Sequence, residues 1–280
     1  MKRWGYLAFV AVACAMWVIQ VRTQHVAAKN LSPANPAKNL APASPARNMT
    51  GEAADSDIDP DAMAALNSMG KYLRSLKAFQ VETVTTKDDV LDNGQQVQYD
   101  THINLVASMP DRFRIDVNGP RQQRQYLYDG KTFTIFAQRV NYYATVPAPE
   151  TVGKLAAALD EKYDIHLPLE DLFYWGTPRS KSGEITSAID IGPTEVGGIT
   201  CEQYAFRQPG LDWQIWIQLG DFPLPKKLVI TTLTDEARPV YTAVLTWNLA
   251  PSFNEAAFEF EPPKDAEKIV IATADASTGN

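Results

Sequence analysis

The sequence predicts an α+β fold that consists mainly of antiparallel β-strands. Residues 211–232 give the clearest evidence, because apolar and polar side chains alternate there with the period of two typical of a half-buried strand. Runs of this kind recur along the chain, separated by short turns rich in Gly, Asn, Asp and Pro. Short turns and few helical segments favour an antiparallel meander over parallel βαβ units.

The first 28 residues predict export from the cytoplasm. Lys2 and Arg3 precede an apolar run from 5 to 21, and Val26-Ala27-Ala28 offers small residues for cleavage. This pattern is typical of a bacterial secretory signal peptide. Because the run is long, an uncleaved N-terminal membrane anchor is the alternative, and membrane contact would then come through this segment alone. We expect the periplasm of a Gram-negative bacterium.

Charge and cysteine content exclude several classes of protein. Residues 1–28 carry three basic residues and no acidic ones, so the formal net charge changes from −7 to −10 without them. An acidic domain is a poor partner for nucleic acid. Cys201 is the single cysteine after the leader, which rules out an intrachain disulfide framework, and we expect it to be a small buried apolar residue.

Composition divides the rest of the chain into three parts. Residues 29–58 are rich in Ala, Pro and Asn, have few large apolar side chains, and predict a disordered linker. Residues 59–264 predict a single folded domain. Residues 265–280 predict a flexible C-terminal tail.

The domain begins with a helix and continues with strands. The sequence predicts a helix over 60–76. Asp59 can cap it, Pro60 occupies the first helical position, and apolar residues follow at helical spacing. Asp92-Asn93-Gly94 predicts a tight turn between the first two strands. We expect about eleven strands, near residues 79–86, 95–107, 113–117, 126–128, 133–135, 142–146, 185–191, 199–207, 212–219, 226–233 and 239–249. Helical pieces are expected at 151–161 and 168–174.

The order of the expected elements forms a recognisable combination. It consists of one capped helix, a long meander, a helical insertion near 150–175 and, at 213–232, the run W-Q-I-W-I-Q-L-G-D-F-P-L-P-K-K-L-V-I-T-T. Over about residues 58–262 it resembles the branch of predicted bacterial periplasmic proteins of unknown function in the LolA/LolB lipoprotein-carrier superfamily. The resemblance implies a strongly curved, incomplete β-barrel, with helices covering the concave apolar face. It also implies a non-enzymatic protein that binds the acyl chains of a lipid or lipoprotein.

The strands provide one long apolar face, and about thirty-five helical residues are available to cover it, so the sheet either fills its interior with side chains or leaves a pocket. The expected lining consists of Phe113, Ile115, Tyr126, Tyr128, Phe133, Ile135, Trp213, Ile215, Ile217, Leu228 and Ile230. For each of these residues, ordinary core packing is the simpler interpretation. Leu169, Leu172 and Phe173, in a short apolar segment between prolines, are candidates for a movable lid, with ordinary helix packing as the alternative.

Catalytic and metal-binding motifs are missing from the sequence. No catalytic residue, metal site or cofactor is predicted, since His102 and His166 with Cys201 lack metal-ligand spacing. A hydrolase using Asp164, His166 and a nearby serine is a remote alternative, and no G-x-S-x-G motif supports it. A second alternative is an envelope scaffold or stress sensor that binds another protein through Trp216 and Trp247 on the solvent-exposed face.

Overall fold

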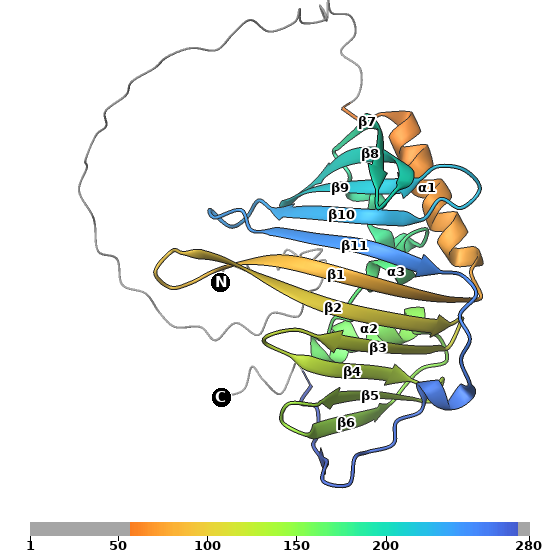
Figure 1. Ribbon diagram of the computed structural model, residues 1–280, viewed down its shortest axis with the longest axis vertical. Helices are drawn as coiled ribbons and strands as arrows, with labels where there is room; N and C mark the ends of the chain where they lie inside the picture. Colours follow the sequence, from red (N-terminus) through yellow and green to blue (C-terminus); the bar gives the residue numbers. More distant parts are fainter. Residues whose placement is uncertain (1–56, 274–280) are drawn as a thin grey trace, which may run out of the picture. The chain divides into compact units, whose positions relative to one another are not determined.

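The computed structural model describes residues 57–273, which form one open sheet of twelve strands beside a small number of helices (Figure 1). The strand order is β12-β6-β5-β4-β3-β2-β1-β11-β10-β9-β8-β7. All neighbouring pairs are antiparallel except β12 with β6. The predicted fold class, an open and mainly antiparallel sheet with helices, is confirmed.

The strands have the following bounds: β1 Ala78–Val90, β2 Gln96–Ser108, β3 Arg112–Asn118, β4 Gln123–Tyr128, β5 Thr132–Ala137, β6 Tyr142–Pro147, β7 Ser187–Val196, β8 Ile199–Gln208, β9 Leu211–Gln218, β10 Pro225–Thr232, β11 Val240–Asn248 and β12 Glu267–Lys268. The first eleven correspond to the expected strands. β1 and β2 pair along their whole length, and Gly94 in the turn between them has φ +80°, a conformation that glycine adopts readily.

The helices are α1 Pro60–Ser75, α2 Val152–Tyr163 and α3 Asp171–Tyr174, with 3-10 turns η1 Pro178–Ser180, η2 Ser182–Glu184 and η3 Glu255–Phe258. α1 begins as expected, because the Asp59 carboxylate accepts a hydrogen bond from the Asp61 N–H. Thr151 caps α2 in the same way through the N–H of Lys154. Figure 1 shows α2 and α3 on the same side of the sheet, and both contribute buried side chains to its apolar core.

Strand register places the predicted lining residues on one face. In β3–β4 and β4–β5, Tyr126 lies opposite both Ile115 and Ile135, and Tyr128 lies opposite both Phe113 and Phe133. Directly opposed residues of an antiparallel pair project from the same face. In β9–β10 the opposed pairs are Ile215 with Leu228 and Trp213 with Ile230.

Three expected boundaries differ from the structure. The helix predicted over 168–174 is reduced to α3, because Leu169 adopts φ +60° and starts the helix late. The predicted linker ends before Ile58, which forms a parallel bridge with Ala188 of β7. The predicted tail contributes β12, which pairs with β6. Backbone pairing outside the main meander carries too little sequence signal to be predicted.

Within residues 57–273, no helix combines the length and hydropathy needed to cross a bilayer. The predicted signal peptide or anchor (1–28), most of the predicted linker (29–58) and the end of the predicted tail lie outside the described residues.

Candidate functional site

The predicted lining residues come together in one apolar cluster on the helix-covered face of the sheet. Ten of the eleven are buried, and Ile135 is half-buried against the cluster. The most enclosed part is aromatic: Phe113 lies 5.6 Å from Tyr128 and 6.3 Å from Phe133 between ring centroids. The structure therefore assembles this lining mainly as packed side chains.

Residues 151–184, here called the cover segment, lie against this face and contain α2, α3, η1 and η2. The Phe173 ring of α3 stacks on Phe113 at 5.9 Å and lies 6.4 Å from Phe79 of β1. Leu172 is also buried, while Leu169 is half-buried. The predicted lid residues thus occupy the space next to the predicted lining.

Arg74, in the last turn of α1, attaches α3 to that helix. Its Nη1 donates to the carbonyl oxygen of Phe173, and its Nη2 donates to that of Leu172. The guanidinium is partly buried and forms no salt bridge within residues 57–273, and its Nε has no hydrogen-bond partner there. Burial lowers the pKa of Arg74. The partly buried guanidinium of Arg74 therefore has two backbone carbonyl groups of α3 as its hydrogen-bond acceptors.

A close backbone contact joins the same two elements. A Cβ built on Gly70 of α1 would lie 2.6 Å from the nitrogen of Gly176, just after α3, and a Cβ on Gly176 would lie 2.6 Å from the carbonyl carbon of Gly70. Gly176 also has φ +78°. A side chain at either position would force α1 and the cover segment apart.

A pocket of about 40 Å³ opens between the cover segment and strands β8 to β10. Its lining residues are Asp171, Trp175, Ser180, Gln208, Leu211, Trp213, Leu228 and Ile230. Three of these, Trp213, Leu228 and Ile230, belong to the predicted lining. The pocket has room for a few water molecules, so a long acyl chain would require the cover segment to move.

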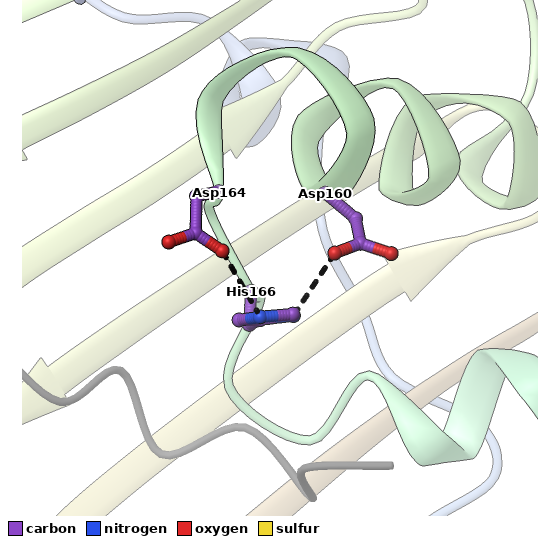
Figure 2. A group of neighbouring side chains, drawn as sticks. All are labelled: Asp160, Asp164 and His166. Carbon is purple, nitrogen blue, oxygen red and sulfur yellow. Dashed lines mark ion pairs between the residues drawn. The ribbon is translucent and has the colours of Figure 1, made fainter. Parts of the chain in front are cut away.

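A group of charged side chains lies at the end of α2 (Figure 2). The Nδ1 of His166 is 3.8 Å from Asp160 Oδ1 and 3.5 Å from Glu170 Oε1, and its Nε2 is 3.8 Å from Asp164 Oδ1. Arg179 from η1 lies 3.3 Å from Asp160. The hydrogen bond with Glu170 raises the pKa of His166, and the negative charges of Glu170, Asp160 and Asp164 raise it further.

Asp160, Asp164 and His166 are close enough to be considered as metal ligands. The two aspartates, however, approach opposite nitrogens of the ring, and one metal ion binds one nitrogen of an imidazole. Arg179 already pairs with one of the two aspartates, Asp160. Within the described residues no hydrogen bond connects His166 to a serine, so the geometry adds nothing to the hydrolase alternative.

The predicted exposure of two tryptophans is wrong. Trp216 does lie on the opposite face of β9 from Trp213, but it is buried, and Lys227 Nζ lies 4.5 Å above its ring centroid. Trp247 packs against Phe79 on the helix-covered face and donates its indole N–H to the Pro225 carbonyl. Alternation assigned Trp216 to a polar face correctly, but it could not show that a lysine stem covers it.

Cys201 is buried, as expected, and burial raises the pKa of its thiol. Sequence reasoning missed Arg74, Asp171 and Gln208. Arg74 and Gln208 donate to backbone carbonyls that are distant along the chain, and Asp171 is distinguished only by its place in the pocket, so none of the three has a local sequence signal. Arg74, for example, contacts a carbonyl 99 residues away.

Solved structures similar to the chain are distant relatives. An uncharacterized conserved protein from Thermus thermophilus is 13% identical with a TM-score of 0.44, over 75% of this chain and 99% of that one. LprF from Mycobacterium bovis is 14% identical with a TM-score of 0.40, over 75% and 99%. A LolA superfamily protein from Nitrosomonas europaea is 8% identical with a TM-score of 0.36, over 71% and 97%. Likenesses this distant do not indicate a function.

No curated protein matches the chain. A family model described as "Predicted periplasmic protein (DUF2092)" matches residues 62–272, which is most of the chain. This match confirms the predicted resemblance to periplasmic proteins of unknown function and the periplasmic location. The chain belongs to the DUF2092 family of predicted periplasmic proteins.

Proposed function

We propose that this protein is a non-enzymatic periplasmic carrier that binds the acyl chains of a lipid or lipoprotein against the helix-covered face of its sheet. The observation that carries the proposal is the position of Phe173. Its ring fills the apolar face beside Phe79 and Phe113, yet it belongs to a helix of four residues. In this proposal an acyl chain takes the place of Phe173 and its neighbours.

An acyl chain offers a free energy of the same order as the contacts that it would replace. Burial of an acyl chain yields about 0.8 kcal/mol per methylene, so a sixteen-carbon chain offers on the order of 10 kcal/mol before ordering costs. Moving α3 away costs its apolar contacts and the two hydrogen bonds from Arg74, each worth about 1.5–3 kcal/mol because the donor is charged. The chain would also contact the aromatic lining that Phe173 contacts now.

The cover segment has the features of a part that moves separately from the sheet. Helix α3 is held to α1 by side-chain hydrogen bonds and by the contact of Gly70 with Gly176. Asp164, Leu169 and Lys181 adopt positive φ values of 52°, 60° and 50°. Such conformations are unfavourable for side chains larger than glycine, and this lowers the cost of releasing the segment.

Native mass spectrometry of protein purified from its own periplasm tests the proposal directly. We expect a bound mass that organic solvent extracts as a lipid. The purified protein should also bind a monoacylglycerol with a fluorophore on its chain. The proposal would be overturned if the protein were purified without a bound lipid and did not bind this probe.

An arginine variant tests the movement of the cover segment. Arg74→Met keeps the apolar stem and removes both hydrogen bonds to α3, together about 3 kcal/mol or more, so the open state should become about a hundredfold more populated and probe association correspondingly faster. The control is Arg139→Met in the exposed turn between β5 and β6. Equal association rates in wild type and Arg74→Met would show that α3 does not control entry.

A further inference from the structure

We infer that the pocket beside Asp171 is a subsite for the cationic amine head of a long-chain amphiphile. This inference rests on the proposed function, since the same pocket contains Trp213, Leu228 and Ile230 from the acyl-chain lining. It adds the chemical class of the head group, which the apolar face alone does not specify.

The carboxylate of Asp171 is the polar group in this pocket that still needs a partner. It forms no hydrogen bond or salt bridge with any residue in 57–273, although it is only partly accessible to solvent. A carboxylate withdrawn from water in this way is stabilised by a donor, and most strongly by a charged one.

Gln208, Trp213 and Ser180 are already engaged, which leaves the indole N–H of Trp175 as the remaining side-chain donor of the pocket. Gln208 donates from Nε2 to the Lys181 carbonyl at 3.0 Å and accepts the Trp213 indole N–H at 2.9 Å. The Ser180 hydroxyl donates to Ser182 at 3.3 Å. A ligand group entering the pocket therefore finds one strong acceptor and little capacity to donate to an anion.

The charge of the pocket and its aromatic lining also favour some head groups over others. Burial, together with the negative charge of Glu170, raises the pKa of Asp171 to about 7, and no cation contributes to that shift. An anionic head would be repelled by the Asp171 carboxylate in the pocket, whereas an ammonium group would compensate its charge. Trp175 and Trp213 supply aromatic surface, which also favours cations. The volume of about 40 Å³ suits a small head and not a sugar.

The test compares dodecylamine, dodecanol and dodecanoate as competitors of the fluorescent monoacylglycerol at pH 8. They share one chain length and differ in head charge. We expect the amine to compete about tenfold better than the alcohol, which is the value of one charge-assisted hydrogen bond, and the carboxylate to be weakest. In Asp171→Asn the amine should lose this advantage while dodecanol is unchanged, which also shows that the variant is folded.

Asp92→Asn, in the exposed turn between β1 and β2, changes the net charge equally and should keep the amine preference. Lowering the pH to 5.5 should reduce the preference in wild type, because the pKa of Asp171 is raised to about 7 and this carboxyl group then becomes protonated. Equal competition by amine and alcohol in wild type would overturn the subsite and leave acyl binding intact. A preference that survives Asp171→Asn would overturn the assignment to Asp171. Failure of all three compounds would overturn the carrier function as well.

Discussion

The sheet and the cover segment are stabilised in different ways. The strands from β7 to β6 are joined by continuous backbone ladders, and their apolar face is closed by pairs such as Phe113 with Tyr128. The cover segment also buries apolar side chains, but it has a four-residue helix in its centre and no backbone ladder, and it is held by an arginine, a glycine contact and a group of charged side chains. We therefore propose the sheet as the permanent scaffold and the cover segment as the part that opens locally.

The largest expected effect compares one phenylalanine from each region. Phe113→Ala creates a cavity in the scaffold and should reduce the free energy of unfolding by about 4 kcal/mol. Phe173→Ala removes an equally buried ring, but its cost cannot exceed the free energy of local opening, so a smaller loss of about 3 kcal/mol is expected. Urea unfolding measures both.

Leu219→Ala, at an exposed position after β9, is the control and should change stability by less than about 0.5 kcal/mol. If Phe173→Ala cost as much as Phe113→Ala, the cover segment would unfold only together with the sheet, and the distinction between the two regions would be lost.

The next effect concerns the contact of α1 with the cover segment. Gly70→Ala improves helix propensity, but its methyl group collides with the backbone of Gly176, and we expect a net loss of about 2–3 kcal/mol. Hydrogen exchange should increase in residues 164–181 and not in the strands. Gly153→Ala in α2, where the added methyl meets no atom within 4 Å, should instead be neutral or stabilising by about 0.5 kcal/mol.

The two regions could be predicted from the sequence to different degrees, for a physical reason. Strand faces follow from alternation, which is a local pattern, so the lining from Phe113 to Ile230 could be named from the residues alone. The cover segment depends on contacts between distant residues. Neither the Arg74 hydrogen bonds nor the pocket at Asp171 leaves a periodic signal, and Leu169 shortens α3 through a backbone conformation that its residue type does not favour.

Asp171 should destabilise the folded protein at neutral pH. Its pKa is raised from 3.8 to about 7, first by burial and then by Glu170, so the folded state keeps a proton that the unfolded chain has lost. Stability therefore falls as pH rises from about 4 to about 7. Asp171→Asn should raise the free energy of unfolding by about 2 kcal/mol at pH 8, roughly half the full value of such a shift because the side chain keeps some solvent contact.

At pH 4 the same variant should have nearly the stability of wild type, since Asp171 is then protonated in the folded state. Thermal unfolding at the two pH values checks the difference. A pH-independent effect would mean that Asp171 is solvated and that the cover segment does not enclose it.

The smallest effect concerns His166, at the start of the path from α2 to α3. Its folded-state pKa is raised above 6.5, chiefly by the hydrogen bond with Glu170, so its stabilising contribution is complete below 6.5 and is lost as pH rises through the folded value. Asp171 also has a raised pKa, so both groups loosen the cover segment as pH rises. His166→Gln should lower the melting temperature at pH 6 and have little effect at pH 9.

The matched control for His166 is His102→Gln, at an exposed position of β2, which should show no such dependence on pH. A loss of equal size at both pH values in His166→Gln would mean that the ring acts through packing. The charged group in Figure 2 would then have no part in joining α2 to α3 within the cover segment, and the contrast with the sheet would depend on Arg74 and the glycine contact alone.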